Sequence, residues 1–472
     1  MKTKKKKSSD LNDVSTSVTV NDATLELVQD MPLAMAVLAQ DTNAVGHILE
    51  THLPAASANH NNNNLQVEDV TITKSVGEAF TGGRSTPVYH VQCCVVVVRS
   101  NEGIIRKRQR HFVIKLVLLP DEESSSDRAK VWMKRESYAV ERRFYGSLAS
   151  KLKSPGNTAV YMATHLTIPK LLYSDHREGH KPWPAACFLF NDLTHAGFPH
   201  HPDFLSYPQA KAALQWLATF HATFWKDLDA KQQVWSRGGF WTIKAKPGYD
   251  NDDDATIQTT TEGLAQQWME SVRWMEQKHP TTSSTDIRTV GKRLEAASES
   301  IEHVLTQQSC TIIHGDYKAA NMFFSSGEDN VENDNNNDHE LDQSHVAVLD
   351  FQFSGWGLGA EDVAYLLFPD ARGDYFDVEE ELLDGYYDAL MEQLILQQKG
   401  GPSSLSRQQL QGQYELARLD LLRYWLGKGW VASTHGDAQL MTAVQSTLGS
   451  LDGGSVLTSQ QDYHQAALRM VS

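Results

Sequence analysis

The sequence predicts an α+β protein with a β-rich N-terminal lobe and a mainly helical C-terminal lobe. Two long β-prone runs, residues 88–98 and 111–118, lie early in the chain. From Pro208 onward most segments have the apolar spacing that is typical of helices. Only short runs at residues 311–313 and 346–349 have strand character in this later part. A β-lobe joined to a helical lobe leaves a cleft between them, which is a common position for a ligand site.

The composition is that of an ordinary globular protein. The 472 residues are 40% hydrophobic and 22% charged, and 43 Lys and Arg against 59 Asp and Glu give a net charge of −16. This balance excludes a generally basic nucleic-acid-binding protein, since phosphate-backbone binding needs clustered Lys and Arg. The four cysteines form no Cys-x-x-Cys pair, which argues against a zinc framework or a disulfide scaffold. No apolar run reaches the roughly 18 residues that span a bilayer, and we expect a cytoplasmic protein.

The chain divides into three expected parts. Residues 1–64 form a tail with short helices and a linker, residues 65–190 the N-terminal lobe, and residues 191–472 the helical C-terminal lobe. The run Lys4–Lys7 is interpreted as part of a solvated tail, with a nuclear address as the alternative. Residues 325–344 are rich in Asn, Asp and Glu, a composition that cannot build a packed core, so they predict a disordered acidic insertion.

Individual elements have their own signals. Apolar stretches in residues 22–53 predict one or two helices, and the tract Asn61–Asn64 predicts a linker. In the run 111–118 alternate side chains face opposite sides, which places Lys115 among apolar neighbours on one face. Pro208 suits the first turn of a helix. Further elements are expected as helices at residues 128–152, 379–397 and 414–432 and as a buried strand at residues 187–190.

The segment with the most specific chemistry is His-Gly-Asp-x-x-x-x-Asn at residues 314–321, which follows a short apolar strand. Asp316 and Asn321 lie five residues apart on a tight loop, so both can face one pocket. Asp350 ends another short strand and brings a second carboxylate. Phosphoryl transfer needs a carboxylate near the acceptor hydroxyl and oxygen ligands for Mg²⁺. The pattern therefore indicates phosphoryl-transfer chemistry.

This pattern, followed by Asp-Phe-Gln at residues 350–352, resembles the aminoglycoside phosphotransferase and choline kinase superfamily. The segments at residues 217–222, 362–365 and 385–390 resemble its ecdysteroid-kinase-like (CHK kinase-like) branch. The resemblance covers roughly residues 65–400. It implies the two-lobed protein-kinase-like fold and an ATP-dependent phosphotransferase that acts on a hydroxyl of a small organic molecule.

The resemblance also implies roles in the C-terminal lobe. Asp316 is expected to be the catalytic base, or the group that orients the acceptor hydroxyl, while Asn321 and Asp350 would hold Mg²⁺ between the ATP phosphates. Lys318 is expected to stabilise the γ-phosphate, with an exposed loop lysine as the alternative. Asp316 and Asp350 are farther apart in sequence than in the family. The acidic insertion explains this, because each doubling of loop length costs only about 0.6 kcal/mol.

In the N-terminal lobe, Val113-Ile114-Lys115 resembles the kinase strand whose lysine binds the α/β-phosphates and pairs with a helix glutamate. Glu141 is the favoured partner because residues 141–145 resemble the Glu-x-x-x-Tyr helix of the family, and Glu136 is the alternative. Gly82 and Gly83 precede the first long strand and would let backbone N–H groups approach phosphate. A simple turn is the alternative for these glycines.

Residues 190–193 resemble the hinge between the lobes, where adenine would contact backbone groups, so Asn191 and Leu193 are expected in the nucleotide site. An ordinary turn at a strand end is the alternative. His221 lies on an apolar helix face and is interpreted as a core histidine, and Asp362 as a brace for the catalytic loop. Large aromatic residues in a helical lobe are mostly core, so none is assigned to the acceptor among Trp235, Phe240, Trp241, Trp356 and Trp425.

Two other function classes compete with a small-molecule kinase. A pseudokinase that only binds partners is disfavoured because Lys115, Asp316, Asn321 and Asp350 are all present. A protein kinase is disfavoured because a full G-x-G-x-x-G motif and an Ala-Pro-Glu motif are missing. We expect ATP and Mg²⁺ as cofactors and a small-molecule alcohol as partner. Sterol-like, choline-like and sugar-like acceptors stay open, and nothing in the sequence points to an oligomeric state.

Overall fold

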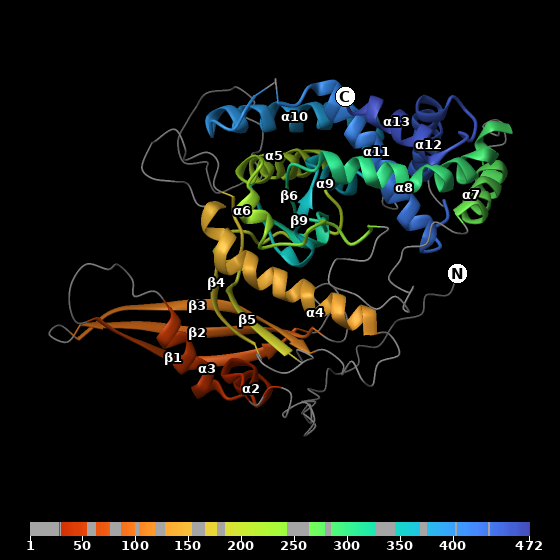
Figure 1. Ribbon diagram of the computed structural model, residues 1–472. Helices are drawn as coiled ribbons and strands as arrows, with labels where there is room; N and C mark the ends of the chain where they lie inside the picture. The colour runs from red at the N-terminus through yellow and green to blue at the C-terminus, as the bar shows by residue number, and fades with distance from the viewer. Residues whose placement is uncertain are drawn as a thin grey trace, which may run out of the picture.

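Two lobes make up the computed structural model of this protein. Figure 1 shows a sheet with small helices at the N-terminal end of the chain and a layered helical lobe toward the C-terminus. The α+β, two-lobed architecture predicted from the sequence is confirmed. The residues that the structure describes are 28, 30–53, 63–75, 86–99, 103–118, 128–152, 166–176, 185–242, 264–278, 285–325, 345–368, 375–401, 404–432 and 435–472.

The elements alternate little: most strands come first and most helices later. The strands are β1 (Asn63–Lys74), β2 (Val88–Arg99), β3 (Gly103–Leu118), β4 (Leu171–His176), β5 (Ala185–Asn191), β6 (Thr311–Ile313), β7 (Met322–Phe324), β8 (Val346–Val348) and β9 (Gly355–Gly357). The helices are α2 (Pro32–Leu38), α3 (Thr42–His52), α4 (Arg128–Arg143), α5 (Tyr207–Thr223), α6 (Leu228–Lys231), α7 (Leu264–Lys278), α8 (Val290–Gln308), α9 (Gly359–Leu366), α10 (Glu379–Leu396), α11 (Arg407–Gly427), α12 (His435–Asp452) and α13 (Gln460–Met470).

The N-terminal lobe is built on an antiparallel five-stranded sheet with the order β1-β2-β3-β5-β4. Strand β3 is central, and Lys115 pairs in register with Val88 of β2 and Phe188 of β5. Phe112 and Ile114 are buried in the core on one face, as the alternation predicts. The sheet therefore directs Lys115 to the opposite face, where the cleft lies.

Helices α2 and α3 cover the first face of this sheet and share its core. The tract at residues 61–64 predicts a linker, but Asn63 and Asn64 begin β1. The reason is tertiary: they pair with Arg99 and Val98 of β2, and this pairing overrides a composition that is typical of loops.

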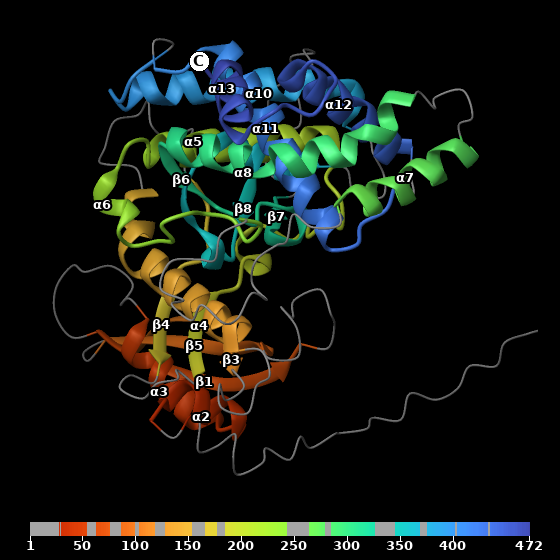
Figure 2. The same ribbon diagram turned by 45° about the vertical axis from the view of Figure 1, so that its right-hand side comes forward.

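Helix α4 covers the other face of the sheet and connects it to the helical lobe (Figure 2). It continues into a π-helical turn, Phe144–Leu148. The ring of Phe144 stacks on Phe351, with centroids 3.9 Å apart and an interplanar angle of 8°. Since Phe351 directly follows Asp350, this contact links the loop that carries Asp350 to the N-terminal lobe.

The helical lobe contains two packed groups. Helices α5 and α10 pack along one another. A second core is formed by α7, α8, α11, α12 and α13. The predicted inward face of α5 is buried at Leu214, Leu217, Phe220, His221 and Phe224. Among the described residues, no helix is both long and apolar enough to cross a membrane.

Two small ribbons carry the loops of interest. Strand β6 pairs with β9, and β7 pairs with β8. The strands predicted at residues 311–313 and 346–349 are thus present as β6 and β8. Residues 1–20, Gly82, Gly83 and residues 326–344 lie outside the described residues, as do residues 101 and 102 between β2 and β3.

Asp175 of β4 makes the packing of α2 on the sheet depend on pH. Its buried carboxylate accepts a hydrogen bond of 2.8 Å from the backbone N–H of Leu33 in the first turn of α2. The other oxygen, Oδ1, has no hydrogen-bond partner among the described residues. Burial raises the pKa of Asp175 to about 6. An unfolded chain releases this proton near pH 3.9, so deprotonation weakens the folded state as the pH rises between these two values.

We therefore expect Asp175→Asn to remove a pH-dependent cost. Between pH 4 and pH 7, the free energy of unfolding of the variant should rise by about 2 kcal/mol relative to wild type, because this range spans most of the pKa difference. Urea unfolding at several pH values measures this change. Asp203→Asn, at an exposed position, is the matched control and should run parallel to wild type. Parallel curves for Asp175→Asn would contradict the argument.

Candidate active site

A cavity of about 360 Å³ lies between the two lobes. It is lined from the sheet, from α4, from the segment that joins the lobes and from both loops of the helical lobe. Every predicted site residue that the structure describes lines it: Lys115, Glu141, Asn191, Leu193, Asp316, Lys318, Asn321 and Asp350. Gly82 and Gly83 are the two predicted residues outside the described part of the chain.

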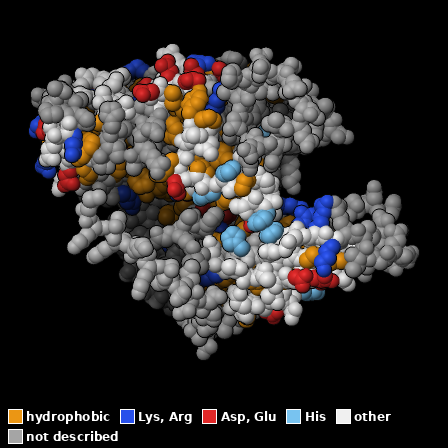
Figure 3. Space-filling model, turned by 180° about the vertical axis from the view of Figure 1, so that it is seen from behind, with side chains coloured by type: hydrophobic (Ala, Val, Ile, Leu, Met, Phe, Trp, Pro, Cys, Tyr) orange, Lys and Arg blue, Asp and Glu red, His pale blue; other side chains and the backbone are white. Residues whose placement is uncertain are grey.

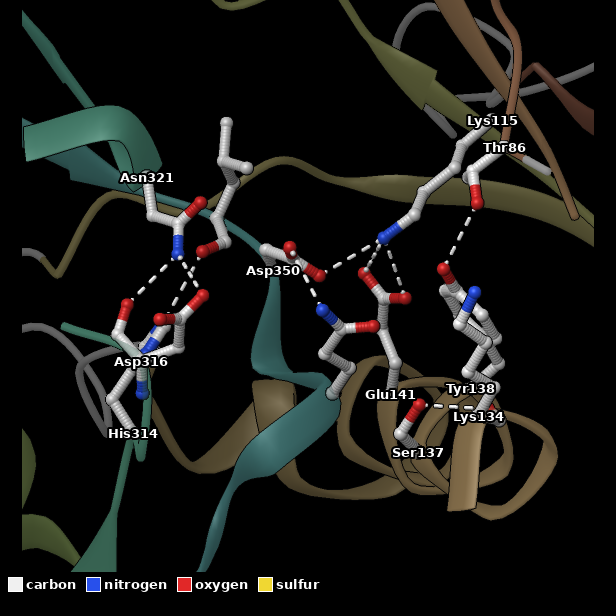
Figure 4. Close-up of polar contacts among 12 residues, drawn as sticks. Thr86, Lys115, Lys134, Ser137, Tyr138, Glu141, His314, Asp316, Asn321 and Asp350 are labelled. Atoms are coloured by element: carbon white, nitrogen blue, oxygen red, sulfur yellow. Dashed lines mark hydrogen bonds and ion pairs between the residues drawn. The ribbon is translucent and has the colours of Figure 1, made fainter. Parts of the chain in front are cut away.

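Lys115 lines this cavity and lies between two carboxylates, Glu141 and Asp350 (Figure 4). Its Nζ is 3.0 and 2.8 Å from the Oε1 and Oε2 atoms of Glu141 on α4, and 3.0 Å from Oδ1 of Asp350. The alternative partner Glu136 contacts Arg135 instead, at 3.3 Å. The structure thus brings together β3, α4 and the loop that carries Asp350 around the ammonium group of Lys115.

Burial and charge act in opposite directions on this cluster. Burial disfavours the ammonium ion of Lys115, but Asp350 and Glu141 outweigh burial and raise the pKa of Lys115 well above its usual value. Burial also raises the pKa of Glu141, against the attraction of Lys115. Lys115 is therefore a permanent cation within the cleft, available to an anionic ligand.

Tyr138 and Thr86 belong to the same cluster, although the sequence analysis did not single them out. The Lys115 Nζ lies 5.1 Å from the centroid of the Tyr138 ring, and the Tyr138 hydroxyl is 3.0 Å from Oγ1 of Thr86. Both residues line the cavity. Tyr138 precedes Glu141 by about one helical turn and so lies on the same face of α4. This spacing is the sequence feature that could have predicted Tyr138 near Lys115.

The loop at residues 314–321 has a conformation that requires glycine at its second position. Gly315 has φ +80°, in the left-handed region. A Cβ atom there would lie 2.2 Å from the carbonyl oxygen of Phe353. The loop therefore approaches the backbone after Asp350 closely enough to bring both carboxylate loops to one place.

Asp362 of α9 holds this loop through its backbone. Its Oδ2 accepts a hydrogen bond from the His314 N–H at 2.6 Å, and its Oδ1 accepts one from the Gly315 N–H at 2.9 Å. Oδ2 also accepts from Nε2 of His221, at 3.2 Å. Asp362 and His221 are fully buried. The expected brace is present, and the core histidine His221 is its buried partner.

His314 has a fixed tautomer. Its Nε2 is 3.1 Å from the carbonyl oxygen of Leu349, which can only accept, so Nε2 carries the proton. Its Nδ1 then accepts from the backbone N–H of Asp316, at 3.3 Å. Burial lowers the pKa of His314, which keeps the ring neutral. His314 is thus a structural link between the two loops.

Asp316 has both carboxylate oxygens engaged. Oδ1 lies 2.9 Å from Nζ of Lys318 and accepts a hydrogen bond of 3.1 Å from the Tyr365 hydroxyl. Oδ2 accepts one of 3.0 Å from Nδ2 of Asn321. Burial raises the pKa of Asp316; Lys318 opposes this shift, and the charge of Asp350 adds to it. A buried carboxylate with a raised pKa is a better proton acceptor than an exposed one.

Asn321 and Asp350 form a donor set that fits a hard divalent cation. Nδ2 of Asn321 donates to Asp316, and Oδ1 accepts no hydrogen bond from the described residues. Asp350 has φ +72°, a conformation that Asp tolerates better than most residues, and its carboxylate lines the cavity. Mg²⁺ is commonly held by one or two such side chains together with substrate phosphates. Within the described residues, no cluster of three His, Cys, Asp or Glu side chains provides a metal site made of protein ligands alone.

The segment that joins the lobes forms one end of the cavity. Asn191 accepts at Oδ1 from the backbone N–H of Lys170 at 2.5 Å, while Leu193 is buried against the cavity. Between them, Asp192 accepts from Thr194 at both the backbone N–H and the hydroxyl, at 2.9 and 2.5 Å. These contacts fix the conformation of the segment beside the cavity.

Histidines gather on the rear face of the molecule (Figure 3). His111 of β3 stacks on His195, with ring centroids 3.5 Å apart. Burial, followed by the neighbouring His195, lowers the pKa of His111. His195 contacts Asp192 at 3.1 Å, so this stack links β3 to the segment that joins the lobes.

The large aromatic residues named in the sequence analysis divide into two groups. Trp235, Trp241 and Trp356 are buried core residues. Phe240 and Trp425 are partly exposed and lie near each other, with ring centroids 6.5 Å apart. None of the five lines the cavity between the lobes.

Asp362 provides a structural test of this loop. Asp362→Asn keeps the shape of the side chain but replaces one acceptor oxygen by an NH₂ group. This group would face an N–H donor of His221, His314 or Gly315, so one hydrogen bond is replaced by repulsion between two donors. We expect a loss of about 3 kcal/mol in the free energy of unfolding, measured by denaturant titration. Asp377→Asn, at an exposed position, should change the free energy by less than about 0.5 kcal/mol. Equal effects of the two variants would contradict the role of Asp362.

Several solved structures are similar to this chain at low sequence identity. The microcompartment-associated aminopropanol kinase is 12% identical, with 89% of this chain and 100% of that chain covered and a TM-score of 0.40. The Plasmodium vivax ethanolamine kinase is 12% identical, with 92% and 91% covered and a TM-score of 0.33. An aminoglycoside-3′-phosphotransferase of type VIII is 13% identical, with 80% and 93% covered and a TM-score of 0.28. All three scores are below 0.5, so these likenesses carry no conclusion about this chain.

The family assignment comes from the sequence. A comparison with curated proteins gave no match. A model of the ecdysteroid kinase-like family matches residues 89–398, which is more than half of the chain and includes Lys115, Glu141, Asp316, Asn321 and Asp350. The match confirms the resemblance seen in the motifs, and this chain belongs to the ecdysteroid kinase-like family.

Proposed function

We propose that this protein is an ATP-dependent phosphotransferase that moves the γ-phosphate of ATP to a hydroxyl of a small organic molecule. The observation that carries the proposal is the convergence of Lys115, Asp316, Asn321 and Asp350 on one cavity between the lobes. Membership of a kinase-like family supports the same reaction class.

ATP would bind between the lobes. The cavity is lined by apolar side chains near the joining segment, including Val88, Val113, Phe190 and Leu193, which suit an adenine ring. Lys115 lines the same cavity as a largely buried cation, and we assign it to the α/β-phosphates. Glu141 holds the ammonium group in place from α4.

The amide oxygen of Asn321 and the carboxylate of Asp350 would hold Mg²⁺. When bound, this ion neutralises phosphate charge during transfer. Gln352 supports Asp350, since its Nε2 donates to Oδ2 at 3.3 Å. The protein's own contribution here is to fix two oxygen ligands beside the phosphate position.

Asp316 would align the acceptor hydroxyl and take its proton. A bond forms between the acceptor oxygen and the γ-phosphorus as the bond from that phosphorus to the bridging oxygen of ADP breaks. The raised pKa of Asp316 suits it to receive the proton. Lys318, at 44% exposure, lies close enough to Asp316 to reach the transferred group as a point charge.

The first test is product detection. Purified protein with Mg-ATP and a broad metabolite extract should yield a species that gains one phosphate, identified by mass spectrometry. Asp316→Asn should lower the rate by about 10²–10⁴-fold, because a general base is lost. Asp377→Asn, away from the cavity, should keep the wild-type rate.

Other results would redirect the proposal. A fall of less than about tenfold for Asp316→Asn would contradict the role of Asp316. Tight Mg-ATP binding without any phosphorylated product would favour a pseudokinase. Phosphate that appears on added proteins would favour a protein kinase.

Nucleotide binding tests the Lys115 cluster without any acceptor. Glu141→Gln removes a charge that holds Lys115, so the Kd for Mg-ATP should rise by about tenfold, equivalent to about 1.4 kcal/mol. Glu136→Gln makes the same chemical change five residues earlier and should alter the Kd by less than about twofold, since Glu136 contacts Arg135 rather than Lys115. Calorimetric titration measures both. Equal Kd values for the two variants would contradict the assignment of Glu141.

A further inference from the structure

We propose that Tyr365 of α9 is a positioning residue that orients the Asp316 carboxylate for phosphoryl transfer. The inference rests on the proposed function and adds a residue to it. Tyr365 does not line the cavity assigned to ATP. Its hydroxyl donates to Oδ1 of Asp316, at 3.1 Å. It therefore acts through Asp316 rather than on the nucleotide.

The two oxygens of Asp316 have different donors, and only Tyr365 comes from outside the loop. Oδ2 receives Nδ2 of Asn321, at 3.0 Å, from within the same loop. Oδ1 contacts the Lys318 ammonium group and accepts a hydrogen bond from the Tyr365 hydroxyl. With only the contact to Oδ2 the carboxylate could still turn about its Cβ–Cγ bond, so a second fixed donor is needed to set the plane of the group.

Lys318 is the less fixed of the two donors to Oδ1. Its side chain is 44% exposed, and it has a flexible stem with a second task at the γ-phosphate in the proposed reaction. Tyr365 has no such second task. When Lys318 turns to the phosphate, Tyr365 is the donor that stays on Oδ1.

Tyr365 is held rigidly enough for this role. Its ring packs against Phe240 and Trp241, with centroids 5.6 and 5.2 Å away. It lies one helical turn after Asp362, which holds the backbone N–H groups of His314 and Gly315. One face of α9 thus fixes the backbone of the loop and, one turn later, the carboxylate that the loop presents. Burial, with the nearby charge of Asp316, raises the pKa of Tyr365 well above its usual value, so its hydroxyl stays a donor.

The consequence is a specific kinetic effect. A carboxylate that can turn away from the acceptor hydroxyl slows the chemical step, because small errors of alignment cost up to about 10²-fold in rate. Mg-ATP binding should not change, because Lys115, Glu141 and Asp350 do not contact Tyr365 in the hydrogen bonds and ion pairs of the described residues.

The experiment compares Tyr365→Phe with Tyr387→Phe. Both variants lose only a phenol hydroxyl. Tyr387 lies on α10 and does not line the cavity, and its hydroxyl donates to the carbonyl of Leu405 at 3.1 Å. Two readouts are taken with the full chain: the Kd for Mg-ATP, and turnover. Turnover is measured as ATP hydrolysis with water as acceptor, and as kcat and KM with the alcohol that product detection identifies.

We expect Tyr365→Phe to lower kcat by about tenfold and to change the acceptor KM and the Kd for Mg-ATP by less than about twofold. Tyr387→Phe should match wild type in all three. An unchanged kcat in Tyr365→Phe would overturn the inference. A joint loss of turnover and Mg-ATP binding would also overturn it, because it would assign Tyr365 to the fold alone. A wild-type protein that binds Mg-ATP but transfers phosphate neither to an alcohol nor to water would refute the proposed function itself, and this inference with it.

Discussion

The contact on which the site depends is the one between Lys115 and its two carboxylates, Glu141 and Asp350. The three groups come from β3, from α4 and from the loop after β8, and their atoms lie within 3.0 Å of Lys115 Nζ. A buried charge without a partner is strongly destabilising, so each group requires the others. The stack of Phe144 on Phe351 runs beside this contact and joins α4 to the same loop. One ammonium group therefore joins the sheet, α4 and the helical lobe at the cleft.

The helical lobe holds the loop at residues 314–321, most of which has no regular secondary structure. Backbone N–H groups in such a loop need acceptors when they are buried. Asp362 supplies them to His314 and Gly315 from the first turn of α9, where a carboxylate is also favoured by the helix dipole. Gly359 allows this close packing, since a Cβ atom there would lie 2.2 Å from the Tyr386 hydroxyl. These contacts hold the loop against the buried core of the lobe.

Sequence reasoning reaches those residues whose signal is local. Asp316 and Asn321 lie on one short loop, and Lys115 stands out as a lysine inside an apolar strand, so spacing and alternation suffice to find them. Glu141 is favoured over Glu136 by a resemblance to the family's helix, whereas its contact with Lys115 depends on how α4 packs against the sheet. Tyr138 and Tyr365 lacked an expected role because their contacts, with Thr86 and with Asp316, join distant parts of the chain. Asn63 and Asn64 are a further case in which a distant contact decides the structure. They form part of a strand because they pair with β2, although their composition is typical of loops.

The charges in the cleft explain why a nucleotide would enter together with a cation. The described residues that line the cavity include four carboxylates, Glu141, Asp192, Asp316 and Asp350, against two lysines. Lys115 is already shared between two of these carboxylates, and Lys318 contacts a third. A bare polyphosphate would meet net negative charge between the lobes, where repulsion is stronger than in bulk water. In the proposed reaction, Asn321 and Asp350 would hold a divalent ion, and its charge would offset this negative charge beside the phosphates. In the proposed reaction, the acidic character of the cleft would therefore require that the nucleotide enter together with its divalent ion, and Asp350 would both repel the phosphates and hold that ion.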